Sequence, residues 1–490
     1  MLFLRAALLF SAASSSAPIR VPILPASTFG AWEGWGTSLA WWANVWGASA
    51  PLADLAFSCN ESVAVPGIPN PLPGLCFNLA RYNVGGSSNA SAGGQHINLS
   101  PSMPWWKQIE AFWLDWESDD PTSASWDWSR DQNQRAMLLA AQARGADTFE
   151  LFSNTPVWWQ LLNHNPSGSD DGASDNLQPW NLANHSKYVA TVAAHAARSW
   201  GVNFTSIELF NEPAAGWWKA SGSQEGCHFD AATQAAVLAA LPAQLARVGL
   251  AGRIRVAASD ESRIDMALAT WAALPAPAKA IIDQVNVHGY QEGGDRAGLY
   301  RAAVVEGGKV LRDSEYGDGD GSGGTLATSI LLDWAQLHPR GWCYWQLVDV
   351  ADGWGMLRGD ADARSLLSVA TKHFVVAQFS RHIRPGMETL GAADPRGATA
   401  AALDVAGKRL VVVTANQAAT GASVVIDLSA FAAAPAGAAR AWWTSTAAPT
   451  PDPAAAHTAV GGVAVAGDKT IALALPPWAV MTIEVDGVEV

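Results

Sequence analysis

The chain has 490 residues, of which 49% are hydrophobic and 15% are charged. This composition excludes wholesale disorder, and the length favours one large domain accompanied by a smaller one. The net charge of −14, from 30 basic and 44 acidic residues, argues against nucleic acid or an anionic membrane as the partner. Packing in the hydrophobic core would account for more than half of the 25 tryptophans. The indole rings of the others are well suited to pack on sugar rings.

The first 17 residues hold one Arg, a short apolar stretch and a run of small residues. This pattern is typical of a signal peptide and is too short to span a membrane. Asn-x-Ser/Thr sequons follow at Asn60, Asn89, Asn98, Asn184 and Asn203. Such sequons are glycosylated only in a secretory pathway, so they support the same destination as the signal-peptide pattern. Together the two features predict a secreted glycoprotein without a membrane span.

The chain has four cysteines, which fit the same compartment. Cys59 and Cys76 flank a loop rich in Pro and Gly and are placed to staple it. Cys227 and Cys343 are expected to remain unpaired. The sequence has no Cys-x-x-Cys and no His-Glu-x-x-His motif, so neither a metal site nor a cofactor is expected.

Between residues 31 and 379, short apolar runs alternate with Ala-rich amphipathic stretches. The predicted strands are Glu33–Leu39, Leu75–Val84, Thr148–Ser153, Ser206–Phe210, Ile254–Ala258, Gln284–His288, Val310–Ser314 and Trp342–Leu347. Eight such alternations favour an α/β fold of the (β/α)8 TIM-barrel type over an open doubly wound sheet. No Gly-x-Gly-x-x-Gly follows the first strand, which also disfavours a dinucleotide-binding fold.

The pattern changes near residue 380. Residues 380–490 alternate apolar and polar positions between Gly, Ala and Pro turns, without a long helical pattern. This predicts a C-terminal side β-sandwich domain. Residues 18–30, which precede the first barrel strand, are expected to add a strand to it.

Polar and aromatic side chains gather where the predicted strands end. In a (β/α)8 barrel the active site lies at the carboxyl ends of the strands. These ends carry Arg81, Asn154, Asn211, Glu212, His288, Tyr290, Glu315 and Trp345. Glu212 and Glu315 follow the fourth and seventh strands, which face one another across a barrel, so we expect them to form a pair.

Two carboxyl groups between aromatic walls suit glycoside hydrolysis. One must be protonated to assist the leaving oxygen, while the other attacks the sugar or activates water. Arg81 is expected to keep a nucleophile ionised, while burial and a negative neighbour keep the acid protonated. Either glutamate alone would be explained as well by a salt bridge at the barrel rim, but two at strand ends with these neighbours favour catalysis.

Two further carboxylates, Asp260 and Glu261, follow the fifth predicted strand. They would serve either as ligands for sugar hydroxyls or as a cap for the next helix. The acidic residue just before a helical pattern favours the cap.

Seven segments run in order along nearly the whole chain beyond residue 17: FGAWEGWGTSLAWWA, RYNVGGSS, ELFSNTPVWW, ELFNEP, VNVHGYQ, SEYGDGDG and QFSRHIRPG. Together they resemble glycoside hydrolase family 30, and within it the endo-β-1,6-galactanase-like branch. The resemblance implies a retaining glycosidase with a barrel and a side β-sandwich. It implies that Glu212 is the acid/base, that Glu315 is the nucleophile and that Asn211 binds the sugar 2-hydroxyl.

The same resemblance implies a set of side chains around the sugar. The residues expected to bind substrate are Arg81, Asn154, His288, Tyr290 and Trp345, with Trp41 and Trp158 nearby. The family's glucosyl-specific members resemble GFGGAxTD in the first strand, whereas this chain has GWGTSLAW. An acidic sugar contact is thus replaced near Trp41, which argues against a glucosylceramidase or a β-1,6-glucanase.

The sequence therefore predicts a secreted, endo-acting β-1,6-galactan hydrolase that acts as a monomer on an oligo- or polysaccharide. An exo-acting β-D-fucosidase or β-galactosidase of the same family is one alternative, separated from the first by the loops around the cleft. A catalytically silent carbohydrate-binding protein is another. Its hallmark would be the loss of one carboxylate, and both are present.

Overall fold

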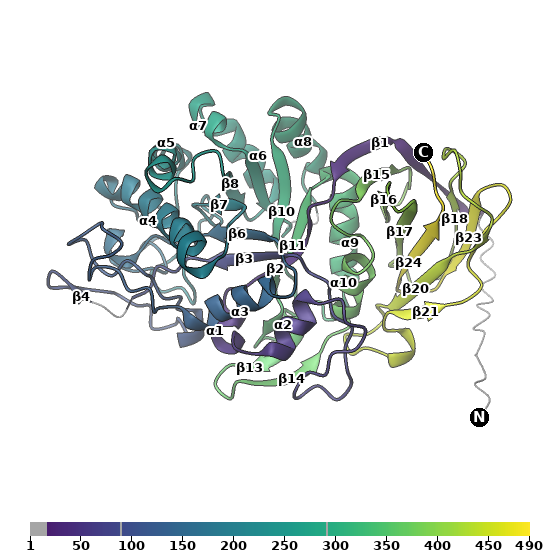
Figure 1. Cartoon of the computed structure of the whole chain (residues 1–490), viewed down its shortest axis with the longest axis horizontal. Coiled ribbons are helices and arrows are strands. Elements are labelled where there is room, and N and C mark those ends of the chain that lie inside the picture. The colour runs from purple at the N-terminus through teal and green to yellow at the C-terminus, as the bar shows by residue number, and fades with distance from the viewer. Residues whose placement is uncertain (1–16, 89–90, 291–292) are drawn as a thin grey trace.

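The computed structural model describes residues 17–88, 91–290 and 293–490. Residues 1–16 of the predicted signal peptide and the Asn89 sequon lie outside these ranges. Eight parallel strands form a closed barrel in the order β10-β11-β2-β3-β6-β7-β8-β9, which confirms the predicted (β/α)8 fold (Figure 1). The barrel strands are β2 (Gly34–Ser38), β3 (Leu79–Asn83), β6 (Thr148–Phe152), β7 (Ser206–Glu208), β8 (Arg255–Glu261), β9 (Gln284–His288), β10 (Val310–Tyr316) and β11 (Gly341–Gln346).

Helices connect these strands and cover the outside of the barrel. They are α1 (Trp42–Trp46), α2 (Ala50–Phe57), α3 (Gln132–Gln142), α4 (Leu182–His195), α5 (Ala231–Val248), α6 (Ile264–Ala273), α7 (Ala276–Ile281), α8 (Arg296–Tyr300), α9 (Gly324–Leu332) and α10 (Lys372–Ser380). Helix α5 shows why these segments are helical, because Val237, Leu241 and Leu245 recur at helical spacing and are all buried. It ends at Gly249, whose φ of +80° reverses the chain direction.

A nine-stranded sheet lies beside the barrel, on the right in Figure 1. In spatial order its strands are β21 (Thr458–Val460), β20 (Arg440–Ser445), β24 (Ala479–Asp486), β17 (Arg409–Asn416), β16 (Thr399–Asp404), β15 (Glu388–Ala392), β1 (Ile19–Ala31), β18 (Ala422–Asp427) and β23 (Thr470–Leu475). Neighbouring strands are antiparallel except β1 and β18, which run parallel. Shorter pairings join β4 (Ser91–Ala92) to β5 (Gln95–His96), β19 (Gly437–Ala438) to β22 (Ala464–Val465), and β12 (Val348–Asp349) and β14 (Ser365–Val369) to β13 (Leu357–Asp360).

Strand β17 shows how the sheet is held against the barrel. Successive side chains of a strand point to opposite faces. Leu410 and Val412 belong to the sheet's own core, whereas Val411 and Val413 belong to the core that continues into the barrel. Both faces of this strand are therefore buried, which is why its sequence is almost continuously apolar.

Strand β1 links the two parts of the structure. Its first residues, Ile19 to Pro22, pair with β18, and Ile23 to Ala31 pair with β15 through two register shifts. The chain then enters the barrel at β2, so the N-terminal strand crosses directly from the sheet to the barrel (Figure 1). Within the residues that the structure describes, no helix is both long enough and apolar enough to cross a membrane.

Cys59 and Cys76 form a disulfide that closes a separation of 17 residues, and Cys227 and Cys343 are free and buried. A crosslink of this loop length reduces the conformational entropy of the unfolded chain and so stabilises the fold by about 3 kcal/mol.

We expect the double Cys59→Ser and Cys76→Ser variant to lose about 3 kcal/mol of free energy of unfolding in urea denaturation. A thiol reductant should destabilise the native protein and leave the double variant unchanged; an unchanged urea midpoint in both cases would contradict the expectation.

Candidate active site

Glu212 lies beyond the carboxyl end of β7. Its φ is +49°, an unusual backbone conformation for a residue with a side chain, and its N–H donates to the carbonyl of Asp260 at 2.8 Å. Residues held in this region cost roughly 1–3 kcal/mol and concentrate at functional sites. The turn aims the carboxyl group over the barrel mouth, where Oε1 is 3.2 Å from Nδ1 of His288.

Glu315 is part of β10, next to an irregularity in the strand. Asp313 pairs with Val287 and Glu315 with His288, so Ser314 is an extra residue on this side. Such a bulge re-aims the side chains around it. Here Glu315 receives hydrogen bonds of 2.9 Å from Nη1 of Arg81 and from the hydroxyl of Tyr290.

His288 contacts both glutamates, which lie close to one another. Nδ1 of His288 is 3.2 Å from Oε1 of Glu212 and 3.4 Å from Oε1 of Glu315. One oxygen of each carboxyl group lies within 4.8 Å of the other. Retaining glycosidases hold their carboxyl groups about 5–5.5 Å apart and inverting ones roughly 6.5–9.5 Å, so this spacing suits the retaining geometry.

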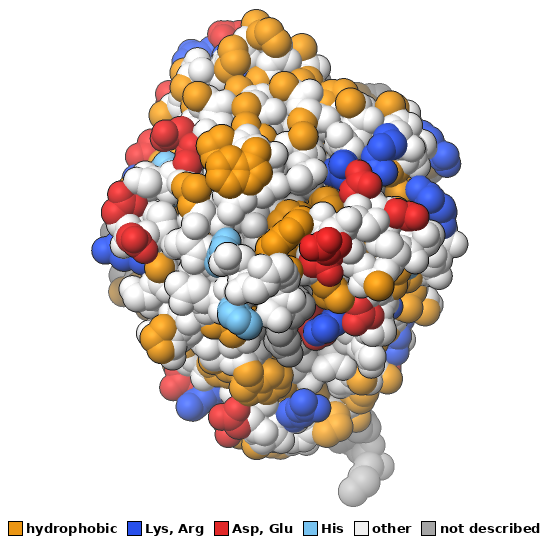
Figure 2. Space-filling view, turned by 90° about the vertical axis from the view of Figure 1, so that its left-hand side faces the viewer, with side chains coloured by type: hydrophobic (Ala, Val, Ile, Leu, Met, Phe, Trp, Pro, Cys, Tyr) orange, Lys and Arg blue, Asp and Glu red, His pale blue; other side chains and the backbone are white. Residues whose placement is uncertain are grey.

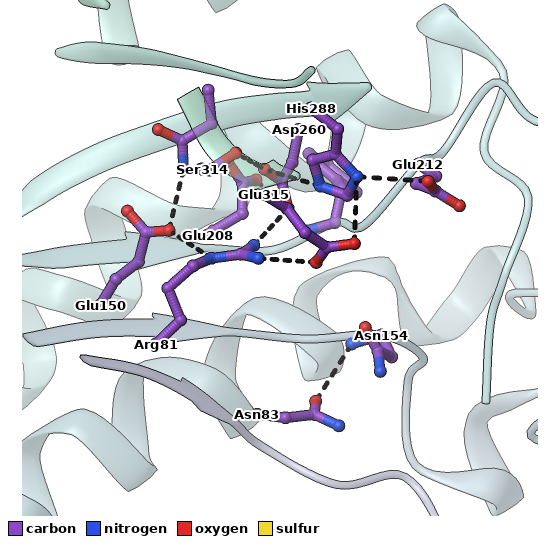
Figure 3. Close-up of polar contacts among 12 residues, drawn as sticks. Arg81, Asn83, Glu150, Asn154, Glu208, Glu212, Asp260, His288, Ser314 and Glu315 are labelled. Carbon is purple, nitrogen blue, oxygen red and sulfur yellow. Dashed lines mark hydrogen bonds and ion pairs between the residues drawn. The ribbon is translucent and has the colours of Figure 1, made fainter. Parts of the chain in front are cut away.

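A buried network of charges supports the pair (Figure 3). Arg81 is fully buried and donates to three carboxylates, at 3.0 Å to Glu150, 2.6 Å to Asp260 and 2.9 Å to Glu315. Asp260 also accepts from the hydroxyl of Ser314 and lies 3.3 Å from Nε2 of His288. A guanidinium shared in this way has little freedom to move, so it fixes Glu315 in one orientation.

Burial and neighbouring charges set the protonation of this network. Burial alone would raise the pKa of Asp260, but Arg81 and His288 outweigh it and hold that pKa at about 2. Burial would lower the pKa of His288, but the charges of Glu315 and Asp260 hold it well above its usual range. We therefore expect an ionised Asp260 beside an imidazolium, whose Nδ1–H faces both glutamates.

Arg81 lowers the pKa of Glu315, as expected, but its charge does not outweigh the effect of burial. Burial raises the pKa of Glu315 above 4.5, and the charges of His288 and Arg81 offset only part of the rise. Catalysis that needs ionised Glu315 should therefore fade, as pH falls, at a higher pH than an ordinary glutamate would give. His288→Gln removes one of the positive charges and should move this acid limb of kcat/KM to still higher pH.

A pH profile of kcat/KM for the native chain and His288→Gln checks this expectation. The exposed His96 offers a matched control, since His96→Gln should leave the acid limb in place. An acid limb that stays fixed or moves to lower pH in His288→Gln would contradict the assignment.

A cleft of about 530 Å³ opens over the pair. Of the residues predicted to act there, it is lined by Trp41, Asn154, Asn211, Glu212, Tyr290, Glu315 and Trp345. Arg81 and His288 are fully buried and contact the glutamates from below. The side-chain oxygens of Asn154 and Asn211 are buried without a hydrogen-bond partner among the described residues, which leaves them free for sugar hydroxyls.

Trp158 is the one predicted site residue that the structure does not bring to the cleft or the glutamates. It lies in a short helical turn, Trp158–Gln160, and is fully buried with its ring edge-on to His164 at 5.5 Å. That turn directs the ring inward, so it packs in the core. The ring contact at the cleft comes instead from Trp41 and Trp345, which meet edge to face at 4.8 Å.

Asp260 and Glu261 do not cap a helix, so that interpretation is wrong. Both residues belong to β8, whose register shifts against β9 between Ser259 and Glu261, and α6 begins beyond Arg263 without a side-chain cap. The shift turns Asp260 into the barrel mouth, where it joins the network. The polar run after the apolar start of β8 was the sequence signal for this placement.

Two other side chains, which the sequence did not predict, lie beside the predicted site residues. Lys107 lines the cleft with its Nζ 3.8 Å from the centre of the Trp41 ring, and burial lowers the pKa of Lys107 to about 8. Trp217 donates from Nε1 to Oε2 of Glu212 at 3.3 Å. The loops that carry both residues have no periodic pattern, so their placement depends on tertiary packing.

Among residues 17–88, 91–290 and 293–490, two groups of side chains are close enough to share a metal ion. One consists of Glu212, His288 and Glu315. Both ring nitrogens of His288 already contact carboxylates of the network, Nδ1 those of Glu212 and Glu315 and Nε2 that of Asp260. In the other group, Asp175 already accepts from the backbone of Asp230, and His228 contacts the carbonyl of Ala215.

The barrel with a close glutamate pair at its mouth defines a glycoside hydrolase. Residues 24–273 match the model of O-glycosyl hydrolase family 30. The endo-beta-1,6-galactanase of Hypocrea rufa is 50% identical over 392 residues, which cover 80% of this chain and 80% of that protein. The chain therefore belongs to O-glycosyl hydrolase family 30.

Solved structures agree with the fold. A conserved exported protein from Bacteroides fragilis has a TM-score of 0.74 at 17% identity, covering 95% of this chain and 99% of the other. The family 30 subfamily 8 xylanase Xyn30A from Clostridium acetobutylicum has a TM-score of 0.68 at 15% identity, covering 96% of this chain and 100% of the other. At these identities the likeness concerns the fold alone.

Proposed function

We propose that this chain is a retaining endo-β-1,6-galactanase that cleaves galactan side chains of arabinogalactan. The observation that carries the proposal is the combination of 50% identity to the Hypocrea rufa galactanase with a close glutamate pair in the cleft. Glu315 attacks the anomeric carbon while Glu212 protonates the leaving oxygen. Glu212 then activates the water that releases the sugar from Glu315.

The binding residues have distinct tasks in this proposal. Arg81 and Tyr290 hold Glu315 in place, and the imidazole of His288 places a positive charge beside the two glutamates. Asn154 and Asn211 offer free side-chain oxygens to sugar hydroxyls. Trp41 and Trp345 provide the apolar surface on which a sugar face packs.

The proposal extends to the organisation of the whole chain. Residues 31–379 form the catalytic barrel, and residues 380–490 form the side domain with a strand from residues 18–30. Removal of residues 1–17 would yield a secreted monomer that carries glycans. Among the described sequons, Asn60, Asn98 and Asn203 are exposed, whereas Asn184 lies in α4 and donates to the side chain of Asn181.

The product profile on de-arabinosylated arabinogalactan tests this function. We expect a ladder of β-1,6-galactooligosaccharides early in the reaction, with pustulan, laminarin and xylan left intact. Early release of single sugars alone would instead favour the exo-acting alternative. No cleavage of the galactan, together with cleavage of any control polysaccharide, would overturn the substrate assignment.

A further inference from the structure

The loop that follows Glu212 carries two adjacent tryptophans, of which the second, Trp218, anchors the loop and the first, Trp217, is exposed. Trp218 is 2% exposed, and its Nε1 donates to the carbonyl of Glu212 at 2.9 Å. A Cβ at Gly226 would lie 2.0 Å from the Trp218 ring, so only glycine permits this close packing. The loop is thereby fixed to the backbone of Glu212.

Trp217, in contrast, is 48% exposed, although its position is defined. Its indole N–H donates to Oε2 of Glu212 at 3.3 Å, and its ring meets Trp218 edge to face at 6.2 Å. Its exposed ring face, held beside Glu212, is available to pack on the apolar face of a sugar. The face on the left side of Figure 1, which Figure 2 shows, carries several separate hydrophobic patches.

The two oxygens of Glu212 indicate on which side Trp217 lies. Oε1 faces His288, which also contacts Glu315, whereas Oε2 faces Trp217. Glu212 therefore stands between Trp217 and Glu315. If Glu315 attacks the anomeric carbon and Glu212 protonates the glycosidic oxygen, the leaving sugar departs past Glu212 towards Trp217.

We propose that Trp217 is the platform for the sugar on the leaving-group side of the cleft. This inference rests on the proposed function and names a specificity residue for the same site. Bond breaking is balanced without Trp217: the Glu315 carboxylate bonds to the anomeric carbon, the C–O bond breaks, and Glu212 gives its proton to the leaving oxygen. Trp217 transfers no proton and contributes by packing its ring on the apolar face of the leaving galactosyl unit.

Two substrates with the same sugar on the nucleophile side separate this role from a merely structural one. One is a β-1,6-galactooligosaccharide, and the other is its dinitrophenyl β-glycoside, whose leaving group is no sugar. Trp217→Ala is expected to lower kcat/KM about 10- to 50-fold on the oligosaccharide, through the lost apolar contact. It should change kcat/KM on the dinitrophenyl glycoside less than about threefold, because little of that contact is used.

Trp217→Phe keeps a flat ring without the N–H group, so it should remain close to the native chain on both substrates. Trp217→Leu keeps apolar volume without a flat face and should resemble Trp217→Ala. Trp478→Ala, at a tryptophan that is 40% exposed beside β24 of the sheet domain, is the matched control and should leave both rates unchanged.

An equal loss on both substrates in Trp217→Ala and Trp217→Leu, or no loss on the oligosaccharide, would overturn the inference. A loss of kcat/KM on the oligosaccharide in Trp217→Phe as large as in Trp217→Ala would also overturn it. The effect of Trp217 would then come from its hydrogen bond to Glu212 and not from its ring face. Failure of the proposed function has a different signature, since the native chain itself would then cleave neither substrate.

Discussion

Glu315→Ala is expected to abolish turnover on every substrate, with kcat lower by roughly 10⁴-fold or more. The carboxylate is held by Arg81 and Tyr290 at 2.9 Å each, so its removal leaves the attack on the anomeric carbon without a nucleophile. The measurement is the initial rate of reducing-sugar release from β-1,6-galactan and of dinitrophenolate release from an aryl β-galactoside.

The exposed Glu306 provides the control, and Glu306→Ala should keep native rates. Azide added to Glu315→Ala should attack from the face that the carboxylate vacates and yield the α-glycosyl azide. Formation of the β-glycosyl azide by this variant would exchange the roles of the two glutamates.

Glu212→Ala is expected to lower kcat/KM on galactan by roughly 10²–10⁴-fold, because the leaving oxygen is no longer protonated. A dinitrophenyl leaving group needs little protonation, so formation of the glycosyl-enzyme from such a substrate should be nearly spared. Its hydrolysis still lacks a base, and the covalent intermediate should accumulate. Added azide should then restore turnover and release the β-glycosyl azide.

The measurement is a stopped-flow burst of dinitrophenolate followed by steady turnover, with and without azide. A burst that azide converts into fast steady release supports the acid/base role. Native-like steady rates on galactan in this variant, or equal losses on both substrates without azide rescue, would contradict it.

The barrel was predictable because its strands are short apolar runs that end in polar residues. Strand β9 is found over the predicted residues Gln284–His288, and β10 and β11 begin within one residue of their predicted starts. The polar residues beyond these runs had to meet at one rim, since all barrel strands are parallel. The sequence pattern therefore predicts that Glu212 and Glu315 meet at this rim.

Asp260 shows why part of the site was not predictable. A period-two pattern assumes a regular strand, and the irregularity in β8 changes which side chains point inward. Trp158 was predicted at the cleft but lies elsewhere, because a short turn after β6 directs its ring into the core. Trp217 lies on a loop whose conformation is fixed by the packing of Trp218 on Gly226, which has no local sequence signature.

Proton NMR of the first products from purified β-1,6-galactan tests the central claim most directly. A retaining pair should release galactooligosaccharides whose new reducing ends are β at first and reach the α/β mixture only by later mutarotation. Appearance of the α anomer first would contradict the mechanism assigned to Glu212 and Glu315, and the absence of cleavage would contradict the substrate.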